Sequence, residues 1–408
     1  MAGGLTQTAA IATPREVSAM RINSHRIAIM ALALLLALGL ALPASADGNG
    51  QSRKIVVFNN TVANEAAQDA IVRGVGGVTV KPLKMLNGAA VILPQAAERA
   101  LAARPGVVRI DDDVAIYATA KRPPAPPLPQ ADPWGIECLN AREAWSLSCG
   151  TGVKVAVLDT GIQFDHPDLA ANIGGGYNAI NSRKPANDGN GHGTHVSGTI
   201  GAINNTIGVV GVAPGVTLYA VKVLNDAGSG FLSDLVEGLD WCRSHGIRVV
   251  NMSLGASTDN QSFHQAISTA YLSGIVLVAA AGNNGGGYGT GTGQVDYPGA
   301  YDEVIAVSAT DKYDGFAVFS SAGPTVDLAA PGVDITSTMK GSSYATWSGT
   351  SMATPHVSAT AAIRIALHPT ESPDAVKTAL QSTATGIGLT PSQQGAGLVN
   401  AYAAATAP

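Results

Sequence analysis

The chain has 408 residues, of which 46% are hydrophobic and 13% are charged, and its formal net charge is −5. This composition is too apolar for an intrinsically disordered chain, and the length allows one large core with smaller appendages. Residues 118–408 carry 13 Lys and Arg against 21 Asp and Glu, and residues 1–117 carry 11 against 8. Neither part has the basic charge expected of a nucleic-acid-binding protein.

The three cysteines are Cys138, Cys149 and Cys242. They are too few for a disulfide scaffold, and their odd number leaves at least one thiol unpaired within the chain. Cys138 and Cys149 are near each other in sequence, so we expect that a bridge between them after export is feasible. None of them lies beside a candidate base, which argues against a thiol protease.

Residues 27–42 are almost wholly aliphatic and are followed by Pro43-Ala44-Ser45-Ala46. This pattern predicts a secretory signal peptide over residues 1–46, cleaved after Ala46, with Met20 as an alternative true start. An uncleaved membrane anchor is the competing interpretation, but the run is short for a bilayer and the Ala-x-Ala site favours removal. We therefore expect a secreted protein with no membrane attachment after cleavage.

The next region, residues 47–117, alternates short apolar runs with helical periodicity. Strands are predicted at 54–58, 78–83, 89–93 and 107–116, and helices at 62–73 and 95–104. This order predicts a small α+β domain of βαββαβ type, which alone would be compatible with a binding module. Residues 118–132 include the sequence KRPPAPPLP, which predicts an extended, exposed linker that is accessible to cleavage.

Residues 133–408 show a longer alternation of the same two patterns. Strands are predicted at 153–158, 217–223, 247–252, 275–280 and 304–307, and helices at 192–202, 231–245 and 261–272. Such alternation predicts an α/β domain with a doubly wound parallel sheet covered by helices on both faces. Ligands of these sheets bind beyond the carboxyl ends of the strands, where Asp159, Ser253 and Asn283 are expected.

A serine stands where a turn gives way to a predicted helix, in the sequence Gly349-Thr350-Ser351 before the apolar run 357–367. The first N–H groups of a helix carry partial positive charge and favour a developing oxyanion. Ser351 is therefore a candidate nucleophile. Taken in isolation, the same pattern would fit an ordinary helix N-cap better.

Three further motifs precede this serine. Asp159 ends the sequence VKVAVLD before Thr160-Gly161, two histidines, His192 and His195, lie in GHGTHVSGT, and Asn283 ends AAAGN. The two histidines lack the H-E-x-x-H frame of a zinc protease, and their spacing alone does not choose between them as a base. Together the four motifs, in the order Asp, His, Ser, resemble the subtilisin-like serine proteases over residues 134 to 399.

This resemblance implies a function for each motif. Asp159, His192 and Ser351 would form the catalytic triad, and the amide of Asn283 would stabilise the oxyanion. His195 would be a packed helix residue. Residues 47–117 would be the inhibitory pro-domain, which acts as an intramolecular chaperone and blocks the cleft with its last strand. Self-processing is expected between Tyr117 and Gln130.

The resemblance also implies the substrate-binding residues. Two edge strands would pair with an extended substrate. The first edge, which also forms one wall of the primary pocket, would be Ser253, Leu254 and Gly255, and the facing wall would be Ala280, Ala281 and Gly282. The second edge would be Gly228, Ser229 and Gly230.

Two specificity positions follow from the same resemblance. Leu232 and Leu235 would line the fourth subsite and favour an apolar substrate residue there, although helix packing explains them equally well. Asp296 would lie at the floor of the primary pocket and favour cleavage after Lys or Arg. Asp296 has two competing roles, capping the amides of its own loop or pairing with a neighbour.

A structural calcium ion is the implied cofactor. Its ligands would be the side chains of Gln130, Asp168 and Asn205 and the backbone oxygens of Ile203, Ile207 and Val209. Mixed carboxylate, amide and carbonyl oxygens suit the hard and flexible shell of Ca²⁺. A surface turn held by Asn205 alone is the competing interpretation.

These observations predict a secreted, monomeric serine endopeptidase that is activated by removal of a pro-domain and that cleaves peptides through an acyl-enzyme. Two rivals belong to other classes. A catalytically inactive binding protein would keep the fold and lose a triad member, but all three are present. A membrane-tethered processing protease would keep residues 27–42.

Overall fold

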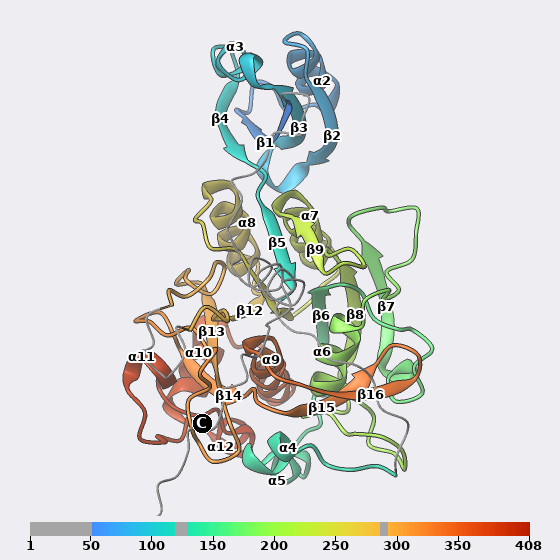
Figure 1. Ribbon diagram of the computed structural model, residues 1–408, viewed down its shortest axis with the longest axis vertical. Coiled ribbons are helices and arrows are strands. Elements are labelled where there is room, and N and C mark those ends of the chain that lie inside the picture. The colour runs from blue at the N-terminus through green and yellow to red at the C-terminus, as the bar shows by residue number, and fades with distance from the viewer. Residues whose placement is uncertain (1–50, 119–128, 286–292) are drawn as a thin grey trace, which may run out of the picture. The chain divides into compact units, whose positions relative to one another are not determined.

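The computed structural model describes residues 51–118, 129–285 and 293–408 (Figure 1). Its largest sheet has seven strands in the order β14-β13-β12-β10-β6-β8-β7, and every neighbouring pair is parallel. The chain runs from β6 to the edge strand β7, returns to β8 beside β6, and then crosses to β10, β12, β13 and β14 toward the other edge. In that order the strands are Leu328–Pro331, Val304–Thr310, Val276–Ala280, Val249–Met252, Lys154–Asp159, Thr217–Lys222 and Ile173–Asn178.

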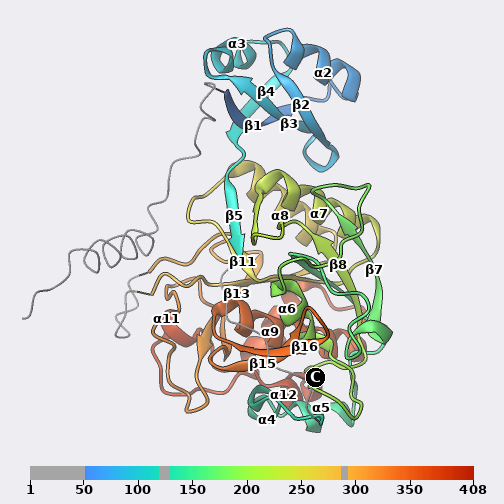
Figure 2. The same cartoon turned by 45° about the vertical axis from the view of Figure 1, so that its right-hand side comes forward.

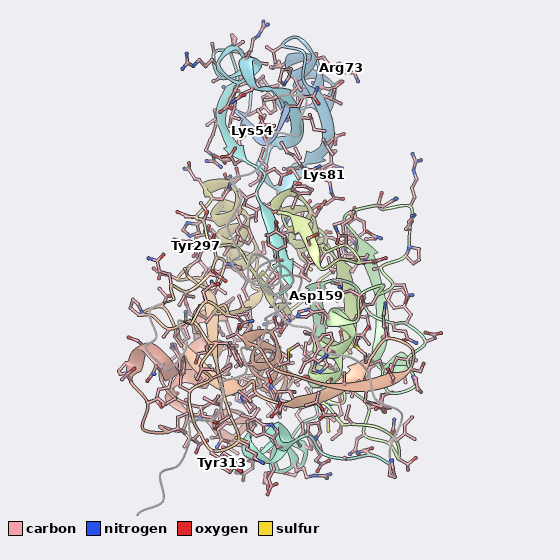
Figure 3. The ribbon with its side chains drawn as sticks, in the orientation of Figure 1. Lys54, Arg73, Lys81, Asp159, Tyr297 and Tyr313 are labelled. Carbon is pink, nitrogen blue, oxygen red and sulfur yellow. The ribbon has the colours of Figure 1, made fainter. Side chains whose placement is uncertain are left out.

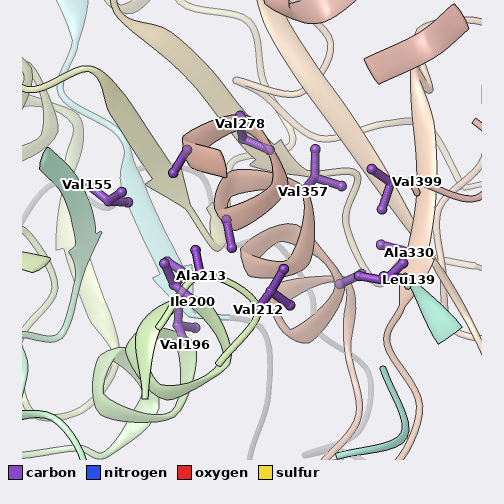
Figure 4. Close-up of a cluster of buried hydrophobic side chains, with 14 of the residues drawn as sticks. Leu139, Val155, Val196, Ile200, Val212, Ala213, Val278, Ala330, Val357 and Val399 are labelled. Carbon is purple, nitrogen blue, oxygen red and sulfur yellow. The ribbon is translucent and has the colours of Figure 1, made fainter. Parts of the chain in front are cut away.

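Helices cover both faces of this sheet. Along β6, Val155 and Val157 enter one hydrophobic cluster whereas Ala156 and Leu158 enter a second one. Figure 4 shows the first cluster, to which α6 (His192–Gly201) and α9 (Thr350–Leu367) contribute. The second cluster is covered by α7 (Leu232–Ser244) and α8 (Gln261–Leu272). The predicted doubly wound α/β architecture is confirmed.

The remaining elements of this domain are short. The hairpin β15–β16 is antiparallel and packs against α6. The helices α4 and α5 open the domain, and α10, α11 and α12 follow α9. Their bounds are β15 Ile335–Met339, β16 Ser343–Trp347, α4 Trp134–Cys138, α5 Ala141–Trp145, α10 Pro373–Ser382, α11 Pro391–Gln394 and α12 Ala401–Thr406.

The region before the linker has the expected βαββαβ order. Its antiparallel sheet has the strand order β2-β3-β1-β4, and the second helix begins as a 3-10 turn at Gln95–Ala97. The elements are β1 Gln51–Phe58, α2 Glu65–Arg73, β2 Val78–Leu83, β3 Gly88–Pro94, α3 Glu98–Ala102 and β4 Val107–Asp112.

The strand predicted at 107–116 is wrong as a single element. β4 ends at Asp112, and a new strand, β5 (Ala115–Ala118), pairs antiparallel with β9 (Ser229–Phe231) and with β11 (Leu254–Gly255) (Figure 2). The apolar residues before and after Asp111–Asp113 have the pattern of one strand that continues through these three residues. A change of pairing partner leaves no trace in such periodicity, because both partners require extended backbone.

The two edge strands of the large sheet, β7 and β14, were not predicted. β7 has the sequence IGGGYN and β14 the sequence LAAP. Glycine and proline are depleted in strands, so propensity argues against both segments. Their pairing with β8 and β13 supplies the backbone hydrogen bonds that override this propensity.

A bridge between Cys138 and Cys149, which the sequence made feasible, is absent, since all three cysteines are free thiols. Cys138 packs against the larger hydrophobic cluster, whereas the Sγ of Cys149 lies 4.0 Å from the carbonyl oxygen of Trp145. The two thiols therefore have separate environments. Burial raises the pKa of Cys138 to about 11, and it also raises the pKa of Cys149, so both are protonated at neutral pH.

The predicted signal peptide lies outside the described residues, as does linker segment 119–128. In the part of the chain that is described, no helix combines the length and apolarity needed to cross a bilayer.

Candidate active site

Asp159, labelled in Figure 3, lies at the carboxyl end of β6 and forms a buried pair with His192. The Nδ1 atom of His192 lies 2.8 Å from Oδ1 and 2.9 Å from Oδ2 of Asp159, and both side chains have no exposed surface. The backbone N–H of Thr160 also donates to Oδ1, at 2.7 Å. A carboxylate held in this way fixes the ring with its hydrogen on Nδ1 and leaves Nε2 to act as a base.

The first turn of α6 carries His192 and lies very close to the loop after β6. A Cβ atom on Gly193 would stand 2.2 Å from the carbonyl oxygen of Gly161, so only glycine fits there. The N–H of Gly193 donates to the Thr160 hydroxyl, which donates in turn to Asp188. Asp188 was not predicted as a site residue, although it stands only three residues before the start of the histidine motif at Gly191.

Asp188 is a buried carboxylate that caps α6. Its oxygens accept the N–H groups of Asn190, Gly191 and Thr194 at 2.8 to 3.0 Å and the Thr194 hydroxyl at 2.7 Å. Carboxylates at a helix N-terminus satisfy N–H groups that the helix cannot pair itself. Asp188 therefore fixes the start of the helix that presents His192.

His195 lies one turn further along α6 and has a different environment. Its Nε2 atom lies 3.1 Å from the carbonyl oxygens of Ile335 and Ala345, and its ring stacks on Trp347 with 4.9 Å between ring centroids. Burial lowers the pKa of His195 to about 3, with a further contribution from the nearby His192. The ring is therefore neutral and packed, away from Asp159.

Ser351 is the second residue of α9 and is fully buried. Its hydroxyl donates to the carbonyl oxygen of Ser253 at 3.0 Å, and the Ser253 hydroxyl donates to the carbonyl oxygen of Ser351 at 2.8 Å. These reciprocal bonds connect the start of α9 to the residue before β11. The Nε2 atom of His192 is buried and has no hydrogen-bond partner among the described residues.

Asn283 follows β12 and is held by the residue before Ser351. Its Oδ1 atom accepts the backbone N–H and the hydroxyl of Thr350, each at 2.9 Å. The Thr350 hydroxyl also accepts the N–H of Gly282 at 3.3 Å. These bonds assign Oδ1 and Nδ2 of the amide, so that Nδ2 is the end directed away from Thr350. This role of Thr350 was not predicted from the sequence.

The two predicted substrate-binding edges lie on either side of β5. Ile116 is paired with Gly230 and Tyr117 with Ser229 on one edge, while Tyr117 and Ala118 are paired with Gly255 and Leu254 on the other. Gly228 precedes β9 with a φ of 79°, a conformation that favours glycine. The chain's own segment thus occupies the central position of a three-stranded antiparallel sheet.

The side chain of Ile116 points into the catalytic domain. It has no exposed surface and belongs to the same hydrophobic cluster as Leu232, Leu235 and Leu254, whereas Tyr117 is 57% exposed. The alternation is that of a strand whose successive side chains face opposite sides. Leu232 and Leu235 therefore pack in the core within the same buried cluster as a strand residue, so the two interpretations of these leucines are compatible.

Asp296 lies between the two predicted pocket walls. A Cβ atom on Gly255 would stand 2.8 Å from the Asp296 Cβ, and one on Gly282 would stand 2.5 Å from its Oδ2. The backbone N–H of Asp296 donates to the carbonyl oxygen of Ala281, which follows Ala280 at the end of β12. The Nδ2 atom of Asn284 donates to its Oδ1 at 2.9 Å, and burial raises the pKa of Asp296 to about 6.

The predicted calcium ligands also lie together. Asp168 is fully buried, and its oxygens accept Nδ2 of Asn205 at 2.7 Å and the N–H of Val209 at 2.9 Å. Gln130 Oε1 accepts the N–H of Asn205 at 2.6 Å. The N–H of Ile203 donates to the carbonyl oxygen of Asp168 at 2.9 Å. One buried carboxylate surrounded by amide groups, with no described cationic side chain paired to it, is a donor set that suits Ca²⁺.

One detail must change if a cation binds there. The Asn205 amide turns Nδ2 toward Asp168, while its Oδ1 accepts the N–H of Ile207 at 2.7 Å. A metal ion would need Oδ1 on the side of Asp168. Across the described ranges, no group of three or more His, Cys, Asp and Glu side chains is placed to hold a metal, so this cation would depend largely on neutral oxygens.

Comparisons with known proteins agree with this geometry. The sequence profile of the subtilase family matches residues 150–398. Subtilisin E of Bacillus subtilis (strain 168) is 42% identical over 359 residues, which cover 87% of this chain and 91% of that protein. M-protease of Shouchella clausii (strain KSM-K16) is 45% identical over 306 residues, 75% of this chain and 76% of its own length. Subtilisin Savinase of Lederbergia lenta is 47% identical over 276 residues, 67% of this chain and 99% of that protein.

The family match covers the segments that carry Asp159, His192, Asn283 and Ser351. The relatives with 41 to 47% identity extend over most of both sequences. The chain therefore belongs to the subtilase family and is a serine endopeptidase of the subtilisin type.

Proposed function

We propose that Ser351 is the nucleophile, His192 the general base, Asp159 the residue that orients this base, and Asn283 an oxyanion donor. The observation that carries the proposal is the buried Asp159–His192 pair, whose histidine lies on α6, a helix that packs against α9 with Ser351 in its first turn. In the first step the Ser351 hydroxyl turns from the Ser253 carbonyl to Nε2 of His192. Its oxygen then attacks the substrate carbonyl carbon while Nε2 takes the proton.

The negative oxygen of the tetrahedral intermediate would be stabilised by Nδ2 of Asn283 together with the backbone N–H of Ser351 at the start of α9. Protonated His192 then gives its proton to the leaving amine, the C–N bond breaks, and an acyl-enzyme remains on Ser351. Water attacks the ester with His192 again acting as the base, which releases the acid product and restores the hydroxyl.

Self-processing is supported by the position of β5. The register pairs Ala118 with Leu254, and β11 is antiparallel to β5. A peptide that continues this register places its next residue opposite Ser253, whose carbonyl oxygen contacts the Ser351 hydroxyl. For the chain itself this predicts cleavage after Thr119, within the expected interval from Tyr117 to Gln130. Ile116 is then the fourth residue before the cleaved bond.

Residues 47–117 would act as the inhibitor and folding chaperone of the catalytic domain. In the precursor β5 would exclude other peptides from the cleft, because it fills the position between β9 and β11. It would also organise these two short edge strands around a common centre. Cleavage, release and degradation of this segment would then open the cleft to substrates.

The proposed specificity has two parts. An apolar residue four places before the cleaved bond would occupy the pocket that Ile116 fills beside Leu232 and Leu235. A basic residue directly before the bond would pair with Asp296, which lies against the two glycine walls and has Asn284 as its only side-chain hydrogen-bond partner among the described residues. The gain is limited because both charges lose water when they pair.

A calcium ion at Asp168 would stabilise the catalytic domain. Gln130, Asp168 and Asn205 would hold it with side-chain oxygens, together with the carbonyl oxygens of Ile203, Ile207 and Val209. The ion would neutralise the buried Asp168 carboxylate and fix residues 129–131, which bridge to Ile207 and Val209. We further propose a secreted monomer that acts on proteins and peptides, with residues 1–46 removed on export and with neither a nucleic-acid partner nor a membrane anchor.

Labelling with a fluorophosphonate probe tests the assignment of the nucleophile. The wild-type protein should be labelled and should mature, whereas Ser351→Ala should be unlabelled and remain a precursor. Ser348→Ala, at an exposed serine three residues earlier, is the matched control and should behave as the wild type. Labelling of Ser351→Ala, or its maturation in purified form, would contradict the proposal.

A further inference from the structure

Helix α7 has no N-cap side chain to accept its first N–H groups, although Asp234 in its first turn accepts the N–H of Phe231 at 3.3 Å. Its N-cap residue is Phe231, which has no polar atom to accept the first N–H groups. The neighbouring helix α8 differs, because its N-cap Asn260 accepts the N–H of Phe263 at 3.1 Å. The first turn of α7 therefore depends on acceptors from another segment.

These acceptors come from the residues just before β5. The N–H of Leu232 donates to the carbonyl oxygen of Val114 at 3.1 Å. The N–H of Ser233 donates to Oδ1 of Asp113 at 2.8 Å, and the Ser233 hydroxyl donates to Oδ2 at 2.7 Å. Asp113 is only 2% exposed and Ser233 is fully buried. A bidentate carboxylate thus occupies the start of a 13-residue helix.

Some charged groups around the Asp113 carboxylate stabilise its negative charge and others destabilise it. Arg53 donates from Nε to Asp113 at 2.6 Å and from Nη2 to the Ser233 hydroxyl at 3.1 Å, and its guanidinium lies 4.1 Å above the Phe231 ring. Asp234 follows Ser233 and pairs with Lys81. For a peptide without Arg53, the helix N-terminus attracts a carboxylate while Asp234 opposes it, which limits the gain.

The carboxylate is joined directly to the substrate-binding cleft. Phe231, the last residue of the edge strand β9, is followed by the first residue of α7. Asp113 lies three residues before Ile116, which fills the pocket beside Leu232 and Leu235. A peptide bound along β9 in the register of β5 therefore leads to the start of α7 within the two residues that precede the paired strand.

We propose that the mature enzyme keeps this position as a subsite for a substrate carboxylate, three residues before the apolar residue that fills the Leu232 pocket. Once the pro-segment has gone, the N–H groups of Leu232 and Ser233 and the Ser233 hydroxyl face solvent and are available to an Asp side chain. For cleavage after the residue opposite Ser253, this is the seventh residue before the cleaved bond. The inference rests on the proposed protease function.

Quenched fluorescent peptides test the subsite. The first peptide has the sequence of residues 113–122, the second carries Asp113→Asn, and the third begins at Ile116. The matured wild-type enzyme should cleave the first peptide, which carries Asp113, with a kcat/KM about fivefold above that of the Asp113→Asn peptide, as expected for one helix cap. The two peptides should differ in KM and not in kcat. The preference should shrink at high salt.

Enzyme variants locate the preference. Ser233→Ala should reduce the difference between the acidic and amide peptides. Ser262→Ala, which removes a serine at the equivalent second position of α8, should leave that difference unchanged, since its partner in the precursor is Asp111 and the peptides lack that residue. Equal rates for the two long peptides, with the short one cleaved, would overturn the subsite alone. Failure to cleave the short peptide would instead overturn the proposed function. If Ser233→Ala keeps the full preference for the acidic peptide, the carboxylate does not bind at the start of α7 and the proposed subsite is wrong.

Discussion

The Oδ1 atom of Asn283 accepts two hydrogen bonds from Thr350, one from its backbone N–H and one from its hydroxyl, each 2.9 Å long. Thr350 is the residue before Ser351 at the start of α9. The proposed oxyanion donor and the proposed nucleophile are therefore connected through a single residue. A side chain that is fixed before the reaction costs no reorganisation when the oxyanion forms.

Replacing Asn283 with Ala should leave folding and substrate binding almost intact but lower kcat. The expected loss is about 10²- to 10³-fold, the value known for the loss of one oxyanion donor in a subtilisin. Steady-state kinetics with a peptide substrate would measure it. An unchanged kcat would remove Asn283 from the mechanism.

Thr350→Val should lower kcat by about fivefold at nearly constant KM, because the Asn283 amide loses one of the two bonds that orient it. Thr350→Ser keeps the hydroxyl and should restore most of the activity. A parallel melting measurement separates this effect from a general loss of stability. If Ser and Val at this position give the same kcat, Thr350 does not position Asn283.

The preference for basic residues should depend on pH through Asp296. Burial raises the pKa of this carboxyl to about 6, so it is charged at pH 8 and mostly protonated at pH 5. We compare kcat/KM for a substrate with Lys directly before the cleaved bond with kcat/KM for one with Phe there. The Lys-to-Phe ratio should rise about tenfold from pH 5 to pH 8. The ratio cancels the titration of His192, which affects both substrates. Asp296→Asn should give a flat ratio, and a flat ratio in the wild type would show that Asp296 does not contact the substrate.

The Asp296→Asn variant should also be more stable than the wild type at high pH, because the charged Asp296 carboxylate that favours basic substrates destabilises the fold. A carboxyl whose pKa is raised by folding stabilises the protein at low pH, and this contribution is lost as pH rises through about 6. Asp296→Asn should therefore raise Tm relative to the wild type at pH 8 and have less effect at pH 5. Thermal unfolding of the Ser351→Ala background at both pH values avoids self-digestion.

Lys81 should control how fast the cleaved pro-domain is released. Its Nζ atom lies 2.5 Å from Asp234, 2.9 Å from Glu237 and 2.6 Å from the carbonyl oxygen of Ala179 (Figure 3). Burial raises the pKa of Asp234, and Lys81 counteracts this effect. Lys81→Ala leaves a buried carboxylate without its cation, at a cost of about 2 kcal/mol or roughly 30-fold in release rate.

The lag between cleavage of the precursor and full activity measures this release, and Lys81→Ala should shorten it. Lys84→Ala is the control, because the Lys84 side chain is 74% exposed and lies 3.8 Å from Glu65 within the same small domain. Equal lags for the two variants would contradict the role of Lys81.

Removal of calcium with EDTA should lower Tm and accelerate self-digestion, since a ligand that binds only the native state stabilises it. Asp168→Asn should produce the same lower Tm and should no longer respond to EDTA. Ser351→Ala again provides an inactive background for calorimetry. Identical melting curves with calcium and with EDTA would exclude a bound ion at Asp168.

Local patterns predicted most of the fold that positions the site. The helix at 261–272 has the predicted bounds, and the apolar runs before Asp159 and Asn283 form β6 and β12 as expected. Both strands are buried on two faces and read as continuous apolar segments. Residues that follow such strands could therefore be placed at one edge of the sheet from the order of the apolar runs alone.

Features that depend on distant partners could not be predicted in this way. The chain changes partner between Asp112 and Ala115, where an acidic side chain caps a helix 120 residues further along the sequence. Asp188 and Thr350 orient His192 and Asn283 through hydrogen bonds that have no sequence periodicity. The glycine-rich sequence of β7 has a low strand propensity, and this segment forms a strand because it pairs with the edge of β8.

The cleft between β9 and β11 selects for backbone as well as for side chains. A segment that replaces β5 must offer N–H groups along its length, since strand pairing on two sides uses them. Proline has no N–H, and five of the nine residues from 121 to 129 are proline. If the proposed cleavage occurs after Thr119, we therefore expect the new N-terminus to be a poor substrate for the mature enzyme and to resist further trimming.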